Sequence, residues 1–121
     1  MDANYLISNL KNWVVIGDVL NESKYASKIL RKFKEHSYTV SGVHPRGGDN
    51  IYTNLSQVPY KIEAIDLCIN SIKGLEYLKE AKILDIKYVL IQPGASSDEI
   101  IEYCKENNIT VVLECALISL G

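Results

Sequence analysis

Short apolar runs alternate along the chain with segments of helical periodicity. The runs cover residues 13–16, 39–43, 65–69, 87–91 and 110–113. They are continuous rather than alternating, which is typical of strands that are buried on both faces of a parallel sheet. We therefore expect such a sheet, with helices covering both of its faces.

The segments between these runs carry apolar residues at helical spacing. Ala26, Ile29, Leu30 and Phe33 recur on one helix face, and charged residues occupy the opposite face. Similar patterns predict helices over residues 72–83 and 97–106, a leading helix over 4–11 that packs across the sheet, and a short helical turn over 54–58. A capping box, formed by Ser96 with the glutamate three residues later, is expected to start the helix over 97–106.

Strands and helices that alternate with right-handed crossovers predict an α/β fold. We expect a doubly wound, Rossmann-like three-layer sandwich with a mostly parallel five-stranded sheet in the order 3-2-1-4-5. The length of 121 residues and the absence of a linker-sized stretch predict one domain over residues 1–121. In such a sheet, ligands bind at the carboxyl ends of the strands where the winding reverses, here between the first and fourth strands. The loops that reach this place are 17–25, 44–49, 70–73 and 92–97.

Composition and charge narrow the classes of partner. Thirteen basic and fifteen acidic residues give a net charge of −2, which is not the basic footprint of a nucleic-acid-binding or membrane-anchored protein. No apolar run is long enough to span a bilayer, and the first residues lack the pattern of a signal peptide. We expect a soluble, cytoplasmic protein that binds neither nucleic acid nor membrane.

The three cysteines do not form a recognisable motif. Cys68, Cys104 and Cys115 are odd in number and contain no CxxC pair, so neither a disulfide framework nor a zinc site is predicted. Cys68 and Cys104 are expected in the core. Cys115 follows the last strand, and it could react with a thiol ligand only if its thiolate were favoured.

The first loop has features that suit a diphosphate. It leaves the first strand through Gly17 and enters a helix near Lys24. Free backbone amides and the positive end of the helix dipole favour an anion at such a helix start, and Lys24 adds a full positive charge. Alternatively, Gly17 makes a tight turn and Lys24 is solvated.

The second loop favours a nucleotide with a phosphorylated ribose. The chain has no GxGxxG or GxxxxGK[ST] motif and no acidic residue at the end of the second strand, so NAD is disfavoured. His44, Pro45 and Arg46 stand there instead. A proline ring can lie against adenine and an arginine fork suits a phosphate, as coenzyme A (CoA) would require. Arg46 could also be an exposed loop charge.

The fourth loop offers polar and flexible groups at the same edge. Gln92 can donate or accept a hydrogen bond, and Gly94 provides backbone freedom after Pro93. The same residues are also ordinary components of a strand-to-helix turn.

These loops resemble those of a known family. The matching stretches are VVIGDVLNESKYASKIL at residues 14–30, YTVSGVHPRG at 38–47, LSQVP at 55–59 and IQPGASSDEIIEYCKENNITVV at 91–112. In this order they are similar to the small CoA-binding domain proteins, also grouped as YccU-like. More distantly, they resemble the N-terminal CoA-binding domain of the succinyl-CoA synthetase alpha subunit.

The resemblance implies a set of ligand-binding residues. The CoA diphosphate would lie at Gly17, Asp18, Val19, Lys24 and Tyr25. The adenine end would lie at Val43, His44, Pro45 and Arg46. Asn70 and Ser71 would flank the ligand, and the opening would be lined by Gln92, Pro93, Gly94 and Ala95. Asp18 departs from the small residue usual in the family, and an inward-pointing carboxylate would repel a phosphate.

The sequence contains no evident catalytic constellation. His36 lies at the polar end of a helix, and His44 is expected to stack on or hydrogen-bond a nucleotide rather than to transfer protons. We therefore favour a module that binds or senses CoA or acyl-CoA over an enzyme. The alternatives are a sensor of NAD(H) or another adenine nucleotide, a subunit of a CoA-linked ligase that needs a partner chain, and an interaction scaffold without a ligand.

Overall fold

The computed structural model describes residues 1–120, which form a six-stranded sheet with helices around it. Along the chain the elements are α1 (Ala3–Asn9), β1 (Asn12–Ile16), α2 (Tyr25–Glu35), β2 (Thr39–Val43), β3 (Ile51–Tyr52), the 3₁₀ helix η1 (Leu55–Gln57), β4 (Ala64–Leu67), α3 (Ser71–Ile83), β5 (Tyr88–Ile91), α4 (Asp98–Glu106), β6 (Thr110–Val112) and α5 (Ala116–Leu120). The strands are all parallel and lie in the order β3-β2-β1-β4-β5-β6.

This topology confirms the α/β, doubly wound, Rossmann-like fold and the order 3-2-1-4-5, which β6 extends. The predicted number of strands is corrected from five to six. The additional strand is β3, which pairs with the end of β2 through two residues. The strand expected over 65–69 is therefore the fourth in the chain, not the third. It corresponds to β4, which lies beside β1 rather than at the sheet edge.

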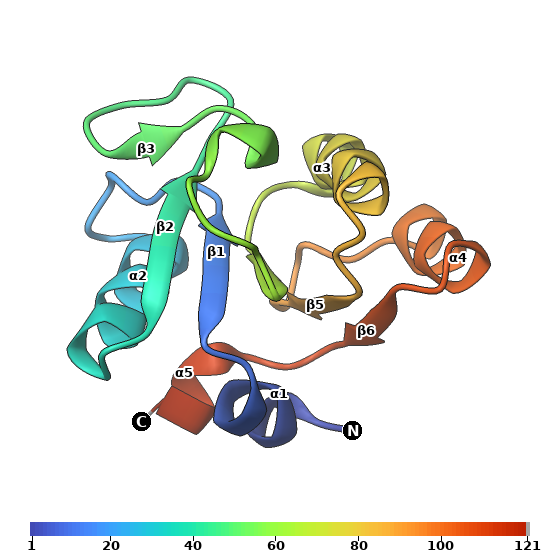
Figure 1. Ribbon diagram of the computed structural model, residues 1–121, viewed down its shortest axis with the longest axis horizontal. Coiled ribbons are helices and arrows are strands. Elements are labelled where there is room, and N and C mark those ends of the chain that lie inside the picture. Colours follow the sequence, from blue (N-terminus) through green and yellow to red (C-terminus); the bar gives the residue numbers. More distant parts are fainter. Residues whose placement is uncertain (121) are drawn as a thin grey trace.

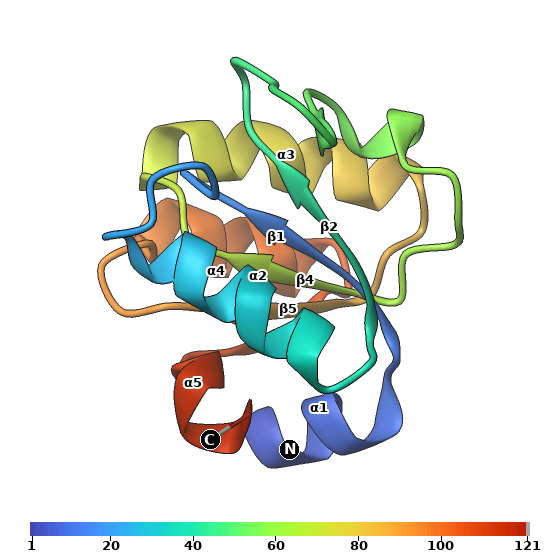
Figure 2. The ribbon, with the colours of Figure 1, turned by 90° about the vertical axis from the view of Figure 1, so that its left-hand side faces the viewer.

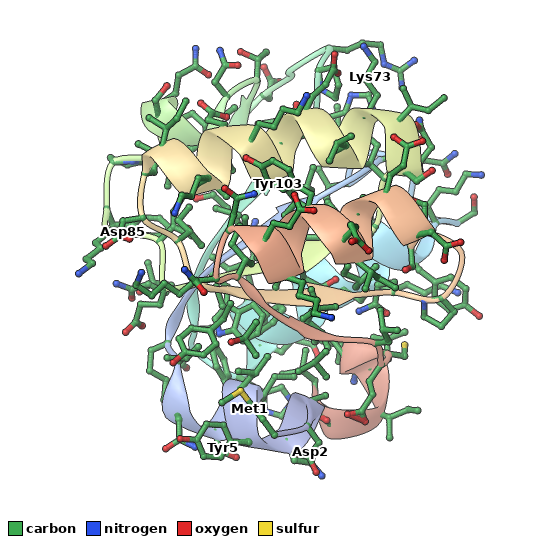
Figure 3. The ribbon with its side chains drawn as sticks, turned by 90° about the vertical axis from the view of Figure 1, so that its right-hand side faces the viewer. Met1, Asp2, Tyr5, Lys73, Asp85 and Tyr103 are labelled. Atoms are coloured by element: carbon green, nitrogen blue, oxygen red, sulfur yellow. The ribbon has the colours of Figure 1, made fainter. Side chains whose placement is uncertain are left out.

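Helices cover both faces of the sheet and give the molecule three layers (Figure 1). α2 lies against one face, above a core that contains Trp13 and Phe33. α3 and α4 lie side by side over the other face (Figure 3), above a core that contains Leu78 and Ile100. Since both faces are covered, the central strands β1, β4 and β5 are almost entirely buried, which explains their continuous apolar runs.

Helix α2 is held firmly against β1. The predicted stripe of Ala26, Ile29, Leu30 and Phe33 is buried, and the Phe33 ring lies 5.0 Å from that of Trp13 between centroids. Tilted aromatic pairs of this kind stabilise beyond the area that they bury. This packing directs the amino end of α2 to the carboxyl edge of the sheet.

The first and last helices lie together on the α2 side of the sheet (Figure 2), where their buried residues share one core with those of α2. α1 ends at Asn9, earlier than expected. It packs against α5, and its Leu6 and Ile7 belong to the same buried core as the sheet residues Leu90 and Val112. The Asp2 carboxylate accepts a hydrogen bond from the Tyr5 backbone N–H at 2.9 Å and thereby caps α1. None of the helices formed by residues 1–120 is both long and apolar enough to cross a membrane.

Two local predictions can be compared in detail. The helical turn expected over 54–58 is η1, where the Gln57 side chain accepts a hydrogen bond from the Asn54 N–H at 3.2 Å. The cap of α4 was placed one residue too early, because Ser97 rather than Ser96 is the N-cap. Its hydroxyl accepts from the Ile100 N–H at 3.2 Å.

Candidate functional site

A cleft of about 330 Å³ opens at the carboxyl edge of the sheet. It lies where the winding reverses, because β1 and β4 are neighbours in the sheet and their crossover helices cover opposite faces. We call it the central cleft. Its lining combines seven of the predicted site residues, namely Asp18, Lys24, Tyr25, His44, Asn70, Gln92 and Pro93, with Ala26, Cys68 and Ile69.

A smaller hollow of about 170 Å³ adjoins the central cleft on the β2 side. It is lined by Asp18, Val19, Leu20, His44, Arg46, Gly47 and Ile51. Asp18 and His44 line both spaces, so they form the wall between them. The residues predicted to bind the diphosphate and those predicted to bind the adenine end therefore lie next to each other at this wall.

Several predicted site residues lie outside the central cleft. The side chains of Val43 and Ala95 are buried in the core beneath α3 and α4, so neither side chain lines the cleft. Ser71 opens α3, and Gly94 occupies an exposed turn with φ +90°.

Gly17 has a packing role that does not require a ligand. A Cβ atom at this position would lie 2.9 Å from the Cys68 Cβ and 3.0 Å from the Ala26 Cβ. Such distances are too short for carbon atoms, so only glycine lets the β1–α2 turn approach the end of β4. The glycine predicted as a point of ligand approach is thus explained by contact between protein elements.

The amino end of α2 reaches the central cleft without a side-chain cap. Lys24 is the N-cap residue and makes no capping hydrogen bond with its side chain. The first backbone amides of a helix lack intrahelical acceptors, and they carry the positive end of its dipole. Lys24 and Tyr25 are exposed beside these amides. This corner of the cleft is therefore suited to an anion.

Opposite charges meet at the wall between the two hollows. The Nδ1 atom of His44 accepts a hydrogen bond from the Arg46 backbone N–H at 3.2 Å. Burial and the nearby Arg46 charge lower the pKa of His44, against an opposing effect from Asp18. A lowered pKa keeps the imidazole neutral at neutral pH, which suits stacking or hydrogen bonding better than anion binding.

A buried carboxylate beneath the cleft was missed by the sequence analysis. Asp66 lies within β4 and is 0% exposed. Its Oδ1 and Oδ2 accept from the Gln92 Nε2 at 3.0 and 3.2 Å, and its Oδ1 also accepts from the Cys68 Sγ at 3.1 Å. Burial raises the pKa of Asp66 to about 7, although these hydrogen bonds favour the charged form. The signal in the sequence was an acidic residue inside an otherwise apolar run.

Cys68 lines the central cleft and is only partly buried, which corrects its assignment to the core. Burial and the Asp66 carboxylate raise the pKa of the Cys68 thiol strongly. Because the thiolate is the reactive form, this cysteine is a hydrogen-bond donor rather than a nucleophile. Cys104 is buried, as predicted.

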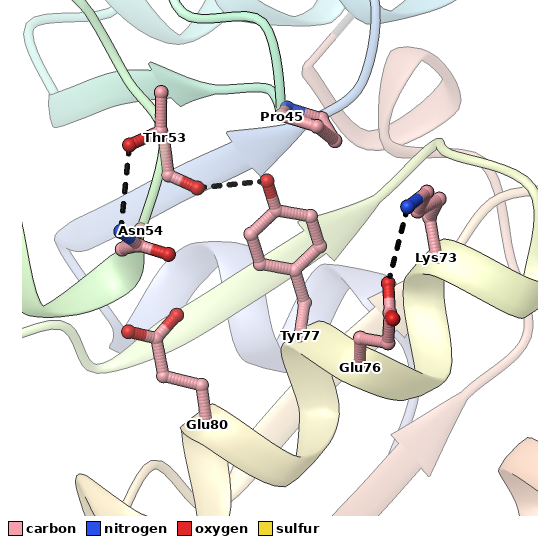
Figure 4. Close-up of a pocket in the computed structure, with 7 residues that line it drawn as sticks. All are labelled: Pro45, Thr53, Asn54, Lys73, Glu76, Tyr77 and Glu80. Atoms are coloured by element: carbon pink, nitrogen blue, oxygen red, sulfur yellow. Dashed lines mark hydrogen bonds and ion pairs between the residues drawn. The ribbon is translucent and has the colours of Figure 1, made fainter.

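The structure also contains a larger groove that the sequence analysis did not anticipate. It measures about 520 Å³ and lies between α3 and the segment around η1, with Pro45 at one end (Figure 4). Its polar groups are engaged with each other. The Tyr77 hydroxyl donates to the Thr53 carbonyl at 2.9 Å, and Lys73 pairs with Glu76 at 3.5 Å.

No metal centre is evident in the part of the chain that the structure describes. Among residues 1–120, no three or more His, Cys, Asp and Glu side chains are grouped so that they could hold an ion.

The layers, strand order and central cleft define a doubly wound α/β domain with an open site at its carboxyl edge. Residues 11–121 match the family described as CoA binding domain, and the chain belongs to that family. No curated protein matches the chain significantly by sequence.

Solved structures support the fold. A hypothetical protein from Pyrococcus horikoshii OT3 superposes with a TM-score of 0.89 and 22% identity over 97% of this chain and 86% of that one. The Thermus thermophilus protein described as cell-free ID.343 gives 0.87 and 23% over 98% and 96%. A conserved hypothetical protein from Pyrococcus furiosus gives 0.79 and 24% over 86% and 93%.

Proposed function

We propose that the protein is a single-domain cytoplasmic module that binds or senses CoA or acyl-CoA in the central cleft. Membership of the CoA-binding domain family supports the class of ligand. The observation that carries the proposal is the uncapped amino end of α2, which opens beside Lys24 into a cleft at the winding reversal. This combination of free amides, dipole and ammonium group suits a diphosphate.

The remaining contacts follow from the direction of the cleft. With the diphosphate at Lys24 and the start of α2, the adenosine extends toward the smaller hollow, where His44 and Arg46 stand. Arg46 is exposed and free to approach the ribose 3′-phosphate. Asn70 and Gln92 remain on the other side of the cleft for the pantetheine arm.

Calorimetric titration with CoA, dephospho-CoA, NAD and ADP tests this proposal. We expect CoA to bind most tightly, and a CoA concentration of about 100 times its Kd to stabilise the fold by roughly 2.7 kcal/mol. Stabilisation by NAD in the absence of any effect of CoA would instead support a nicotinamide or adenine-nucleotide sensor. Binding of none of these ligands would contradict the proposal and favour an interaction scaffold.

The proposed role is recognition without catalysis. The Cys68 thiol is held protonated, and His44 has a backbone N–H as its hydrogen-bond donor. Incubation of the protein with an acyl-CoA is expected to leave the thioester intact, as followed by the appearance of free thiol. Release of CoA above the rate of the protein-free control would indicate a thioester-handling enzyme.

A further inference from the structure

The cluster of Asp66, Gln92 and Cys68 places an unusual constraint on the central cleft. Asp66 lies in register with Val15 of β1 and Leu90 of β5, so its nearest neighbours along the sheet are apolar. A carboxylate in such surroundings is costly unless donors surround it. Its side-chain donors are the Gln92 amide and the Cys68 thiol, and both of these residues line the cleft.

The carboxylate fixes which end of the Gln92 amide is available. An amide group carries donors on its nitrogen and acceptors on its oxygen. Because the Gln92 Nε2 is directed to both oxygens of Asp66, the Oε1 atom must point away from the carboxylate. The backbone of Gln92 is held as well, since its N–H donates to the Leu67 carbonyl at 3.0 Å and its carbonyl accepts from the Ala95 N–H at 3.0 Å.

The freed oxygen has no partner inside the protein. Among residues 1–120, the Oε1 atom of Gln92 is the buried side-chain polar atom without a hydrogen bond, and Gln92 itself is 5% exposed. An unpaired buried acceptor destabilises a fold by roughly 1–3 kcal/mol. A hydrogen-bond donor on a ligand that enters the cleft would remove this cost.

We propose that Asp66 is a positioning residue that presents the Gln92 Oε1 as an acceptor for an N–H donor on the neutral arm of the ligand. This inference rests on the proposed function. Phosphate oxygens are acceptors, so neither the Oε1 atom nor the adjacent carboxylate attracts them. A secondary amide N–H, as in the pantetheine arm of CoA, supplies the missing donor. The diphosphate remains at Lys24 on the other side of the cleft.

The test uses ligands that differ in this donor. Two CoA analogues, each with one arm amide N–H replaced by an ester oxygen, are compared with CoA and with adenosine 3′,5′-bisphosphate, which lacks the arm. For the unmodified protein we expect one ester analogue to bind about fivefold more weakly than CoA, as the loss of one hydrogen bond predicts.

Two variants connect this loss to the cluster. In Asp66→Asn the partner no longer dictates the orientation of the Gln92 amide, and in Gln92→Met the acceptor is absent. In each we expect CoA to bind more weakly and the ester penalty to shrink below about twofold. Binding of adenosine 3′,5′-bisphosphate should be unchanged, which also shows that the variants fold. Asp85→Asn, at an exposed turn residue, is the matched control and should preserve the full penalty.

The outcomes separate the two proposals. If the unmodified protein binds both ester analogues as tightly as CoA, the role of Gln92 is refuted and CoA binding stands. An ester penalty that persists in both variants also refutes the role of Gln92. The same holds if the variants weaken adenosine 3′,5′-bisphosphate as much as CoA, since the adenine would then be the donor. If CoA does not bind at all, the proposed function itself fails.

Discussion

Asp18 places a carboxylate at the carboxyl edge of the sheet. It lines both the central cleft and the smaller hollow, beside the place proposed for the diphosphate. Lys24 lines the same cleft with the opposite charge, so the two side chains have opposing effects on a bound anion. The affinity for CoA therefore depends on a balance that single substitutions can shift.

Removing the Asp18 charge should strengthen CoA binding. We expect Asp18→Asn to tighten CoA by about three- to tenfold at low salt, because a partly exposed like charge costs roughly 1 kcal/mol. Calorimetric titration at two salt concentrations measures the effect, which should diminish as salt screens the charges. Asp98→Asn, at an exposed position of α4, is the matched control. An unchanged affinity for Asp18→Asn would mean that its carboxylate points away from the phosphates.

Arg46 should distinguish CoA from its dephosphorylated form. We expect Arg46→Ala to weaken CoA by about tenfold and dephospho-CoA much less, because only CoA presents a 3′-phosphate to the guanidinium. Titrations with both ligands measure the ratio. Arg31→Ala, on the charged face of α2, serves as the matched control. Equal losses for the two ligands would remove the assigned role of Arg46.

The residues of the site were predictable to different degrees. Lys24, His44 and Gln92 lie in segments that follow strands, and the parallel topology alone brings these segments to one edge of the sheet. Val43 ends β2, and its side chain points into the core beneath α3 and α4 because successive strand residues face opposite sides of the sheet. Asp66 was overlooked because a run between Ile65 and Leu67 was treated as uniformly apolar, whereas strand residues alternate between the two faces.

At the scale of elements, one carboxylate of α3 caps the start of η1. Glu80 of α3 accepts hydrogen bonds from the backbone N–H groups of Leu55 at 2.8 Å and Ser56 at 3.1 Å. These are amides at the start of η1, where a helix lacks internal acceptors. The contact fixes the connection between β3 and β4, which forms one wall of the groove in Figure 4.

Loss of this cap should destabilise the protein. We expect Glu80→Ala to lower the free energy of unfolding by about 1–2 kcal/mol, since two backbone amides, one of them partly buried, lose a charged acceptor. Chemical denaturation measures the change. Glu76→Ala is a matched control on the same helix. Its exposed pair with Lys73 should contribute less than about 0.5 kcal/mol. Equal effects of the two substitutions would argue against the capping role.

Elements with a long apolar stripe were predicted best, and the shortest strand was missed. α2 was foreseen because four buried positions share one helix face. β3 was missed because two residues cannot display a period, and its pairing with β2 depends on the path of the preceding loop. The cap of α4 was misassigned because two adjacent serines precede the helix, and only the backbone geometry distinguishes them.

At the scale of the whole molecule, Asp66 should make stability depend on pH. Its pKa rises from 3.8 when unfolded to about 7 in the fold, so the folded state binds the proton more tightly. Its contribution to stability is complete below pH 3.8 and is lost as the pH rises to about 7. This difference in pKa corresponds to about 4 kcal/mol of folding free energy at most.

This dependence can be isolated by comparison with a neutral variant. We expect the free energy of unfolding of Asp66→Asn, relative to that of the unmodified protein, to increase between pH 5 and pH 8. Urea denaturation at both values provides the measurement, and Asp85→Asn controls for the loss of an exposed carboxylate. A difference that is independent of pH would show that Asp66 titrates normally in the fold.

The pairing of α1 with α5 has a practical consequence for handling the protein. Both helices lie on the α2 side of the sheet (Figure 2), and neither contributes a residue to the lining of the central cleft. A tether fused ahead of α1 can therefore anchor the molecule to a biosensor chip without occupying the cleft. A reporter attached there would monitor occupancy without obstructing ligand entry.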